Sequence, residues 1–190
     1  MNNIIVRDNA VPTSLFNDCQ NSLNRLRWVM SPDILPEQLG KGRGINFNKT
    51  TFPSLLLVHT AYHYIRDQNP WIYQEIESYL YANMLDAAVK TCGYKLDKVL
   101  RIKFNLQQPH PRNKRKFHNV PHVDNTNDKH YSLIFYPENT DGDTVLFNQM
   151  MENVGQTKPK LTVAKRVSPI ANRCVMFNGW RYHAGSNPSK

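Results

Sequence analysis

Apolar residues in the first half of the chain recur every three or four positions in two segments. In residues 12–30 they form one face of a helix, with Thr13 or Ser14 available as the N-cap. In residues 70–92 they form one face of a second helix. Residues 54–65 (SLLLVHTAYHYI) are a short apolar run that does not by itself separate a buried helix from a strand, and we interpret it as a helix. The first half is therefore predicted to be mainly helical.

Beyond residue 93 the pattern changes to the alternation of polar and apolar residues that is typical of strands. In residues 99–106, Arg101, Lys103 and Asn105 alternate with three apolar residues, which indicates a strand with two different faces. Further strands are predicted at residues 131–136, 144–147, 161–167, 173–177 and around His183. Helices followed by many short strands favour an antiparallel sandwich with helices packed on its outside. The predicted fold class is α+β, mainly β.

The length of 190 residues is typical of one domain. We expect residues 1–190 to form a single domain, with residues 1–93 as a mainly helical support and residues 94–190 as the catalytic core. Hydrophobic residues make up 40% of the chain, which excludes a wholly disordered protein. No run approaches the ~20 apolar residues that cross a bilayer, and the N-terminus has no signal-peptide pattern. We therefore expect a cytoplasmic protein with no membrane partner.

The cysteines and the charge add two constraints. Cys19, Cys92 and Cys174 are far apart and never form a CxxC pair, which favours reduced thiols over disulfides or a zinc knuckle. The formal net charge is +9, and much of the excess lies in residues 110–118 and 158–166. Such basicity attracts nucleic acid, acidic proteins or a small dicarboxylate alike, and it also fits solvated surface loops.

The most informative local motif is Pro121-His122-Val123-Asp124. His122 and Asp124 are two residues apart, so in an extended segment their side chains point to the same side and can bind one metal ion. A second histidine, His183, follows the predicted strand at residues 173–177. Two imidazoles and one carboxylate are the facial triad of non-haem Fe(II) oxygenases, whereas zinc prefers a tetrahedral site that often includes cysteine. The predicted metal is Fe(II), held by His122, Asp124 and His183.

The order of motifs around this triad resembles the 2-oxoglutarate- and Fe(II)-dependent oxygenases, particularly the prolyl 4-hydroxylase-like branch of phages and bacteria. The matching elements are the PHxD start, a strand that ends in Tyr136, the DGDT turn that leads into TVLF, and the distal HAGSNP. The resemblance covers residues 94–190, while the first half matches only in general character. It implies a double-stranded β-helix, or jelly roll, in agreement with the run of short strands.

The resemblance also implies a pocket for the cosubstrate 2-oxoglutarate. In this family the cosubstrate chelates iron through its 1-carboxylate and 2-keto oxygens, and its distal carboxylate is bound by hydroxyl donors and a basic side chain. Tyr136 and Thr144 align with such donors, and Asn105 is a further candidate.

The basic anchor departs from the family pattern. Relatives place this Lys or Arg on a strand after the distal histidine. In this sequence the candidate is Lys190, only seven residues after His183, where such a strand would begin. Arg101 or Lys103 on the strand at residues 99–106 is the alternative anchor.

The implied reaction converts 2-oxoglutarate and O₂ into succinate and CO₂ while a C–H bond is hydroxylated. A peptidyl proline is the expected substrate, with the loop at residues 110–119 as a lid and Trp180, Arg181 and Arg115 as candidate substrate contacts. Ascorbate is an additional cofactor to test, and a phage-encoded protein would act in the host cytoplasm. Two alternatives remain: an oxygenase of the same chemistry that acts on nucleic-acid bases, and a catalytically inactive binding module.

Overall fold

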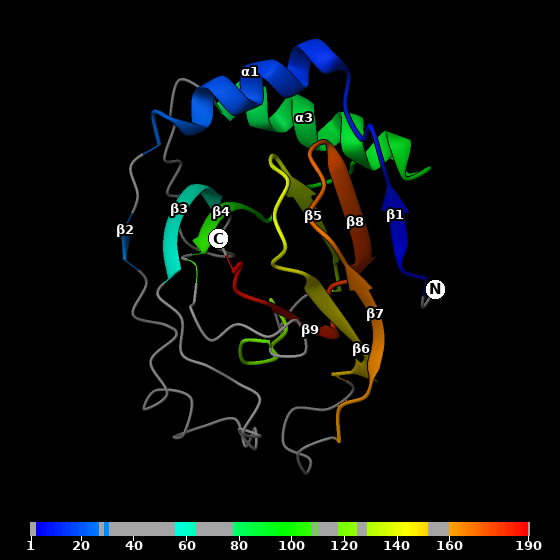
Figure 1. Cartoon of the computed structure of the whole chain (residues 1–190). Coiled ribbons are helices and arrows are strands. Elements are labelled where there is room, and N and C mark those ends of the chain that lie inside the picture. Colours follow the sequence, from blue (N-terminus) through cyan, green and yellow to red (C-terminus); the bar gives the residue numbers. More distant parts are fainter. Residues whose placement is uncertain are drawn as a thin grey trace.

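Figure 1 shows the computed structural model of the chain, which describes residues 3–26, 29–30, 56–63, 78–107, 109, 118–124, 129–151 and 160–189. Its helices in these residues are α1 (Thr13–Leu23) and α3 (Ser78–Thr91). Its strands are β1 (Ile5–Arg7), β2 (Val29–Met30), β3 (Leu56–His63), β4 (Arg101–Gln107), β5 (Tyr131–Tyr136), β6 (Thr144–Met150), β7 (Val163–Val167), β8 (Arg173–Asn178) and β9 (Arg181–Gly185). The described part of the chain is mostly β, as predicted.

The strands form antiparallel sheets with the orders β1-β8-β5, β2-β3-β4 and β7-β6-β9. The β-strands predicted in the second half of the chain are all present, with ends that differ by a few residues. No helix among the described residues is long and apolar enough to cross a membrane.

Helices α1 and α3 lie side by side and cover one face of the strands (Figure 1). One cluster of buried and half-buried side chains joins them to the outer faces of β5 and β8, and it includes Cys19, Met84, Leu133, Phe135, Cys174 and Met176. A second cluster joins them to β4, where Phe104 packs edge-to-face on Tyr81 at 4.7 Å between ring centroids. The even-numbered residues Ile102 and Phe104 of β4 therefore face the helices, as the predicted two-faced strand requires.

A separate apolar cluster lies on the inner face of β5 and β8. It comprises Tyr136, Leu146, Val167, Val175 and Phe177, which come from β5, β6, β7 and β8. The sheet β7-β6-β9 consequently packs against the sheet β1-β8-β5, and the inner faces of both sheets meet where the predicted triad lies.

Two predictions about the first half are wrong. The described part of residues 54–65 is not helical, because Leu56–His63 is the strand β3, which pairs antiparallel with β4. A short apolar run suits either conformation, and pairing with a distant strand decides between them. The predicted helix over residues 12–30 ends at Leu23, and Val29–Met30 is the strand β2. Pro12 occupies the N-cap position of α1, with no capping bond from a side chain such as Thr13.

The second predicted helix is confirmed for Ser78–Thr91, and residues 70–77 lie outside the described residues. It ends at Thr91, two residues before Gly93, whose positive φ of 85° suits glycine. Strand β1 is an element that the sequence pattern did not predict. It pairs with β8, so the N-terminal segment contributes a strand to the sheet of the second half.

Candidate metal centre

Backbone pairing brings the two predicted histidine ligands together. His122 and His183 form an isolated antiparallel bridge, in which each backbone N–H donates to the other residue's carbonyl at 2.9 Å. Residues opposite each other in such a pair point to the same face, and the two imidazole centroids lie 4.5 Å apart. Phe177 of β8 packs edge-to-face on the His183 ring at 5.0 Å and helps to fix its position.

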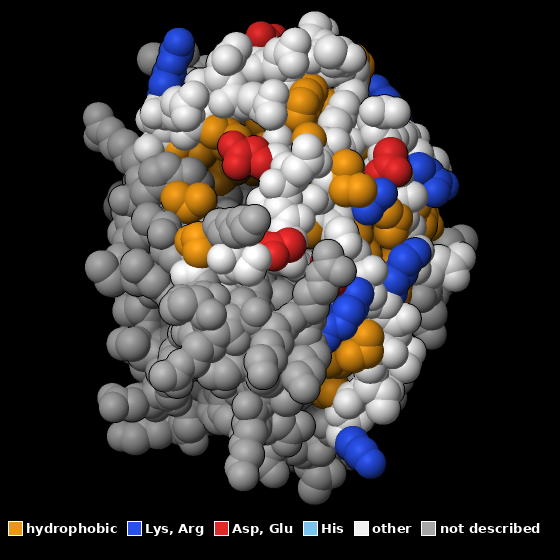
Figure 2. Space-filling view, in the orientation of Figure 1, with side chains coloured by type: hydrophobic (Ala, Val, Ile, Leu, Met, Phe, Trp, Pro, Cys, Tyr) orange, Lys and Arg blue, Asp and Glu red, His pale blue; other side chains and the backbone are white. Residues whose placement is uncertain are grey.

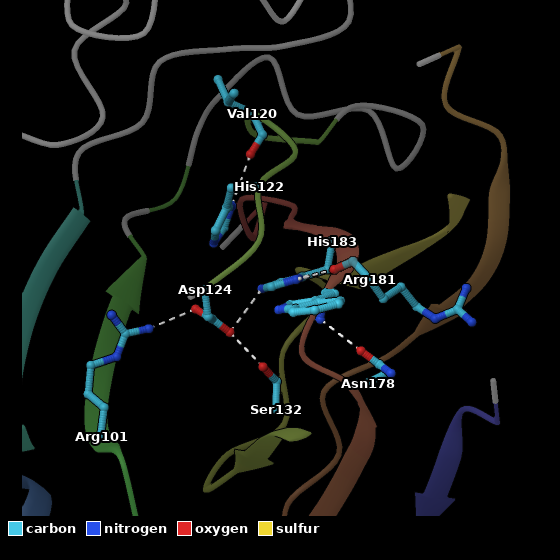
Figure 3. A network of polar contacts seen from close by, with 9 residues as sticks. Arg101, Val120, His122, Asp124, Ser132, Asn178, Arg181 and His183 are labelled. Atoms are coloured by element: carbon cyan, nitrogen blue, oxygen red, sulfur yellow. Dashed lines mark hydrogen bonds and ion pairs between the residues drawn. The ribbon is translucent and has the colours of Figure 1, made fainter. Parts of the chain in front are cut away.

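Each imidazole is oriented by a backbone carbonyl. The Nδ1 atom of His122 lies 3.2 Å from the carbonyl of Val120, and Nδ1 of His183 lies 3.1 Å from the carbonyl of Arg181 (Figure 3). When Nδ1–H donates to a carbonyl, the lone pair is on Nε2, which is the usual arrangement of a metal-binding histidine. Both rings are therefore prepared to offer Nε2 to a metal.

Asp124 completes the cluster. Its Oδ2 lies 3.5 Å from Nε2 of His183 and accepts a hydrogen bond of 2.8 Å from the Ser132 hydroxyl on β5. Its Oδ1 accepts a hydrogen bond of 2.8 Å from Nη2 of Arg101 on β4, as Figure 3 shows. One ligand atom from each of His122, Asp124 and His183 lies within 4.8 Å of the other two. Two segments remote in sequence, residues 118–124 and strand β9, thus hold one carboxylate and two imidazoles together.

The electrostatics keep Asp124 and His183 in the protonation states that bind metal. Burial raises the pKa of Asp124, but His183, His122 and Arg101 together with the Ser132 hydrogen bond outweigh it and lower the pKa to about 2. Burial, and then the neighbouring His122, lower the pKa of His183 to about 4. At neutral pH Asp124 is ionised and His183 is neutral, so no proton must leave either group before a cation binds. The donor set fits Fe(II) by its chemistry.

The two predicted hydroxyl donors also lie side by side. The Tyr136 hydroxyl donates to Oγ1 of Thr144 at 2.8 Å, and both side chains are buried. Burial raises the pKa of Tyr136, so the hydroxyl stays protonated and able to donate. Thr144 pairs with Gly185, and Leu146 pairs with His183, so the hydroxyl pair shares the inner face with the metal cluster. The cross-strand pairs Thr144–Gly185 and Leu146–His183 are two residues apart along the strands, which corresponds to about 7 Å between their backbone positions.

The other predicted site residues lie in different places. Asn105 is exposed, on the same face of β4 as Arg101 by strand alternation. Arg181 is buried and its Nη1 donates to the Phe147 carbonyl, while its side chain leads away from Asp124 (Figure 3). Trp180 is half-buried in the turn between β8 and β9. The substrate roles of Arg181 and Trp180 stay predictions.

Two more of the predicted residues, Lys190 and Arg115, lie outside the described residues. Ser132 is a contact of the candidate ligand Asp124 that the sequence did not predict. It shares the inner face of β5 with Tyr136, and the alternation along residues 131–136 was the signal that pointed to it. The sequence suggests Arg101 as an alternative anchor for the cosubstrate, whereas the structure pairs it with the candidate ligand Asp124.

No family model matches the sequence, and no curated protein matches it either. Solved structures do match the fold. A prolyl 4-hydroxylase from Pseudomonas putida superimposes with a TM-score of 0.51 and 13% identity, over 100% of this chain and 88% of that chain. A prolyl hydroxylase from Trichoplax adhaerens, in complex with a peptide fragment of the hypoxia-inducible factor oxygen degradation domain, gives a TM-score of 0.52 and 14% identity over 100% of this chain and 79% of that chain. The chain has a prolyl-hydroxylase-like fold.

Proposed function

We propose that this protein is an Fe(II)- and 2-oxoglutarate-dependent oxygenase that hydroxylates a peptidyl proline. The observation that carries the proposal is the arrangement of His122, Asp124 and His183 within 4.8 Å, in a chain whose fold matches prolyl hydroxylases. A jelly-roll core is part of the proposal, with β7-β6-β9 and β1-β8-β5 as its facing sheets.

The candidate metal site supports the iron-dependent part of this reaction. His122, Asp124 and His183 would hold Fe(II) through two nitrogens and one oxygen, which leaves positions for a bidentate cosubstrate and for O₂. Bound there, the iron supplies O₂ activation coupled to the oxidative decarboxylation of 2-oxoglutarate. Because Oδ1 of Asp124 is engaged by Arg101, Oδ2 is the oxygen that faces His183 and is available to the metal.

The inner face of β6 supports the cosubstrate assignment. The buried hydroxyls of Tyr136 and Thr144 lie about two strand residues from His183. Hydrogen bonds from hydroxyls to a carboxylate are charge-assisted and stronger than bonds between neutral groups. A dicarboxylate with one end at the metal can therefore place its other end against these hydroxyls.

The choice of a proline-containing peptide rests on the structural neighbours, one of which is a prolyl hydroxylase with a bound peptide fragment. Nucleic-acid bases are less well supported. On the described part of the face in Figure 2, Lys and Arg side chains are separated by acidic, hydrophobic and other side chains and form no continuous basic surface. An extended patch of that kind is the usual electrostatic footprint of nucleic-acid binding.

The test is an incubation of the Fe(II)-loaded protein with 2-oxoglutarate, O₂, ascorbate and a library of proline-containing peptides, followed by mass spectrometry. We expect a gain of one oxygen on proline and a matching amount of succinate. Oxygen on nucleobases alone would contradict the substrate assignment. The absence of both succinate formation and 2-oxoglutarate binding would identify an inactive module.

A further inference from the structure

Strand β4 borders the metal centre with its odd-numbered residues. Ile102 and Phe104 pack toward the helices, so Arg101 and Gln107 point to the opposite side by strand alternation. At one end of this row Arg101 contacts Asp124. At the other end Gln107 lies against Gly185 of β9, two residues from the ligand His183.

Gly185 leaves space for the Gln107 side chain. A Cβ atom on Gly185 would overlap the side-chain nitrogen of Gln107 and would lie 3.3 Å from both its Cδ and its Oε1. The Cβ position of Gly185 is on the same face of β9 as the His183 ring, because the two residues are two apart. The Gln107 amide therefore lies over the inner face of β9, on the side where the metal ligand points.

The same position adjoins the hydroxyl pair. Gly185 is the cross-strand partner of Thr144, whose Oγ1 accepts the hydrogen bond from Tyr136. Directly paired residues have neighbouring side-chain positions on one face of the sheet. Gln107 above Gly185 and the hydroxyl of Thr144 therefore converge from β4 and β6 on one small region.

The Gln107 amide has capacity to bind a ligand. It is half-buried, and no described residue makes a hydrogen bond with its side chain. A primary amide carries two N–H donors, and an ionised carboxylate accepts up to four hydrogen bonds. The partly buried amide beside two hydroxyls thus matches the far end of a dicarboxylate.

We propose that the Gln107 side-chain amide donates to the distal carboxylate of 2-oxoglutarate, together with Tyr136 and Thr144, and that Gly185 provides the space for it. This inference rests on the proposed function. It adds a neutral donor, the Gln107 amide, to the two hydroxyls that we propose for binding the distal carboxylate. Arg101, the alternative basic anchor, is already bound to Asp124 at the other end of β4.

The test is calorimetry on the protein loaded with Zn(II), which occupies the site without turnover. Two 2-oxo acids are compared: 2-oxoglutarate, and 2-oxobutyrate, which lacks the distal carboxylate. We expect Gln107→Leu to weaken 2-oxoglutarate binding about ten- to a hundred-fold, the usual effect of losing a hydrogen bond to a charged group. Binding of 2-oxobutyrate and of Zn(II) should not change. Gln149→Leu is the matched control, because the amide of Gln149 bonds Thr162 elsewhere.

Gly185→Ala supplies a second variant that leaves Gln107 in the sequence. The added methyl group meets only the flexible end of Gln107 among its nearest neighbours, so the fold tolerates it while the amide is displaced. We expect the same selective loss of 2-oxoglutarate affinity. Unchanged 2-oxoglutarate affinity in Gln107→Leu, or an equal loss for both acids, would overturn the inference. If the parental protein binds neither acid, the proposed function itself fails.

Discussion

The two carboxylate oxygens of Asp124 have different partners. Oδ1 is bound by Arg101, and Oδ2 accepts from Ser132 and faces Nε2 of His183. A carboxylate held in this way would offer one oxygen to a metal. The orientation of this candidate ligand therefore depends on two side chains from β4 and β5 that are not themselves candidate ligands.

Removing the guanidinium of Arg101 tests this dependence. In Arg101→Met the carboxylate of Asp124 loses its bond at Oδ1 and keeps the one from Ser132 at Oδ2, so its orientation is less restricted and we expect metal affinity to fall about ten- to a hundred-fold, as for other partners of metal ligands. Titration of the apoprotein with Co(II), followed by its visible absorption, measures both affinity and coordination geometry. Arg25→Met, beyond the end of α1, is the control. An unchanged affinity and spectrum in Arg101→Met would show that Arg101 does not position Asp124.

A second prediction concerns the hydroxyls of Tyr136 and Thr144, which we propose bind the distal carboxylate of 2-oxoglutarate. Tyr136→Phe and Thr144→Val each remove one donor to the distal carboxylate, and each loss should cost about 1.5 to 3 kcal/mol of binding free energy. The KM for 2-oxoglutarate should rise about ten- to a hundred-fold, with a smaller change in the free energy of unfolding. Tyr79→Phe on the exposed face of α3 is the matched control. An unchanged KM in both variants would move the carboxylate pocket elsewhere.

The candidate metal ligands could be predicted because the HxD spacing and the distal histidine motif are local sequence features. The contacts of Arg101 with Asp124 and of Gln107 with Gly185 were not. They join residues that are distant in the chain, and only the arrangement of β4 beside residues 118–124 and beside β9 brings them together.

Among the elements, the strands of the second half were predicted well, since their polar and apolar residues alternate and turn residues separate them. The element β3 was misassigned because its apolar run has no period that excludes a helix. Strand β1 has only three residues, Ile5–Arg7, and its conformation is defined by pairing with β8. Such short elements depend on partners that the local pattern does not reveal.

The attachment of the N-terminal segment to β8 depends on Asn172. This buried residue has a φ of 60°, and its side chain both accepts from the Val11 N–H at 3.0 Å and donates to the Val11 carbonyl at 2.9 Å. Its backbone N–H donates to Tyr136 and its carbonyl accepts from Ala10. One asparagine thus connects the start of α1 with the turn between β7 and β8.

We expect Asn172→Ala to lower the free energy of unfolding by about 2 to 4 kcal/mol, because it leaves both backbone groups of Val11 without the Asn172 side chain and because alanine tolerates the left-handed region less well than asparagine. Asn172→Gly removes only the side-chain bonds and should lose about 1 kcal/mol less. Urea unfolding measures both, with exposed Asn24→Ala at the C-cap of α1 as the control. Equal stability of the parent and Asn172→Ala would contradict this role.

At the scale of the whole molecule, the helices support the sheets from one side, and the candidate site lies on the other side. The helices α1 and α3 cover the outer faces of β4, β5 and β8 (Figure 1), and the inner faces meet β6, β7 and β9. The candidate ligands, the hydroxyl pair and Gln107 all lie on the inner side. The helical cover thus stabilises the strands without contributing a ligand to the described site.

The central claim is that His122, Asp124 and His183 bind the iron that drives turnover of 2-oxoglutarate. The most direct test is the Fe(II)-dependent formation of succinate from 2-oxoglutarate by the parental protein, His122→Ala and Asp124→Ala, with circular dichroism to confirm folding. We predict turnover by the parent, none by either variant, and sharply weakened iron binding in both, because each loses one of three ligands. Succinate formation at the parental rate in either folded variant would contradict the claim.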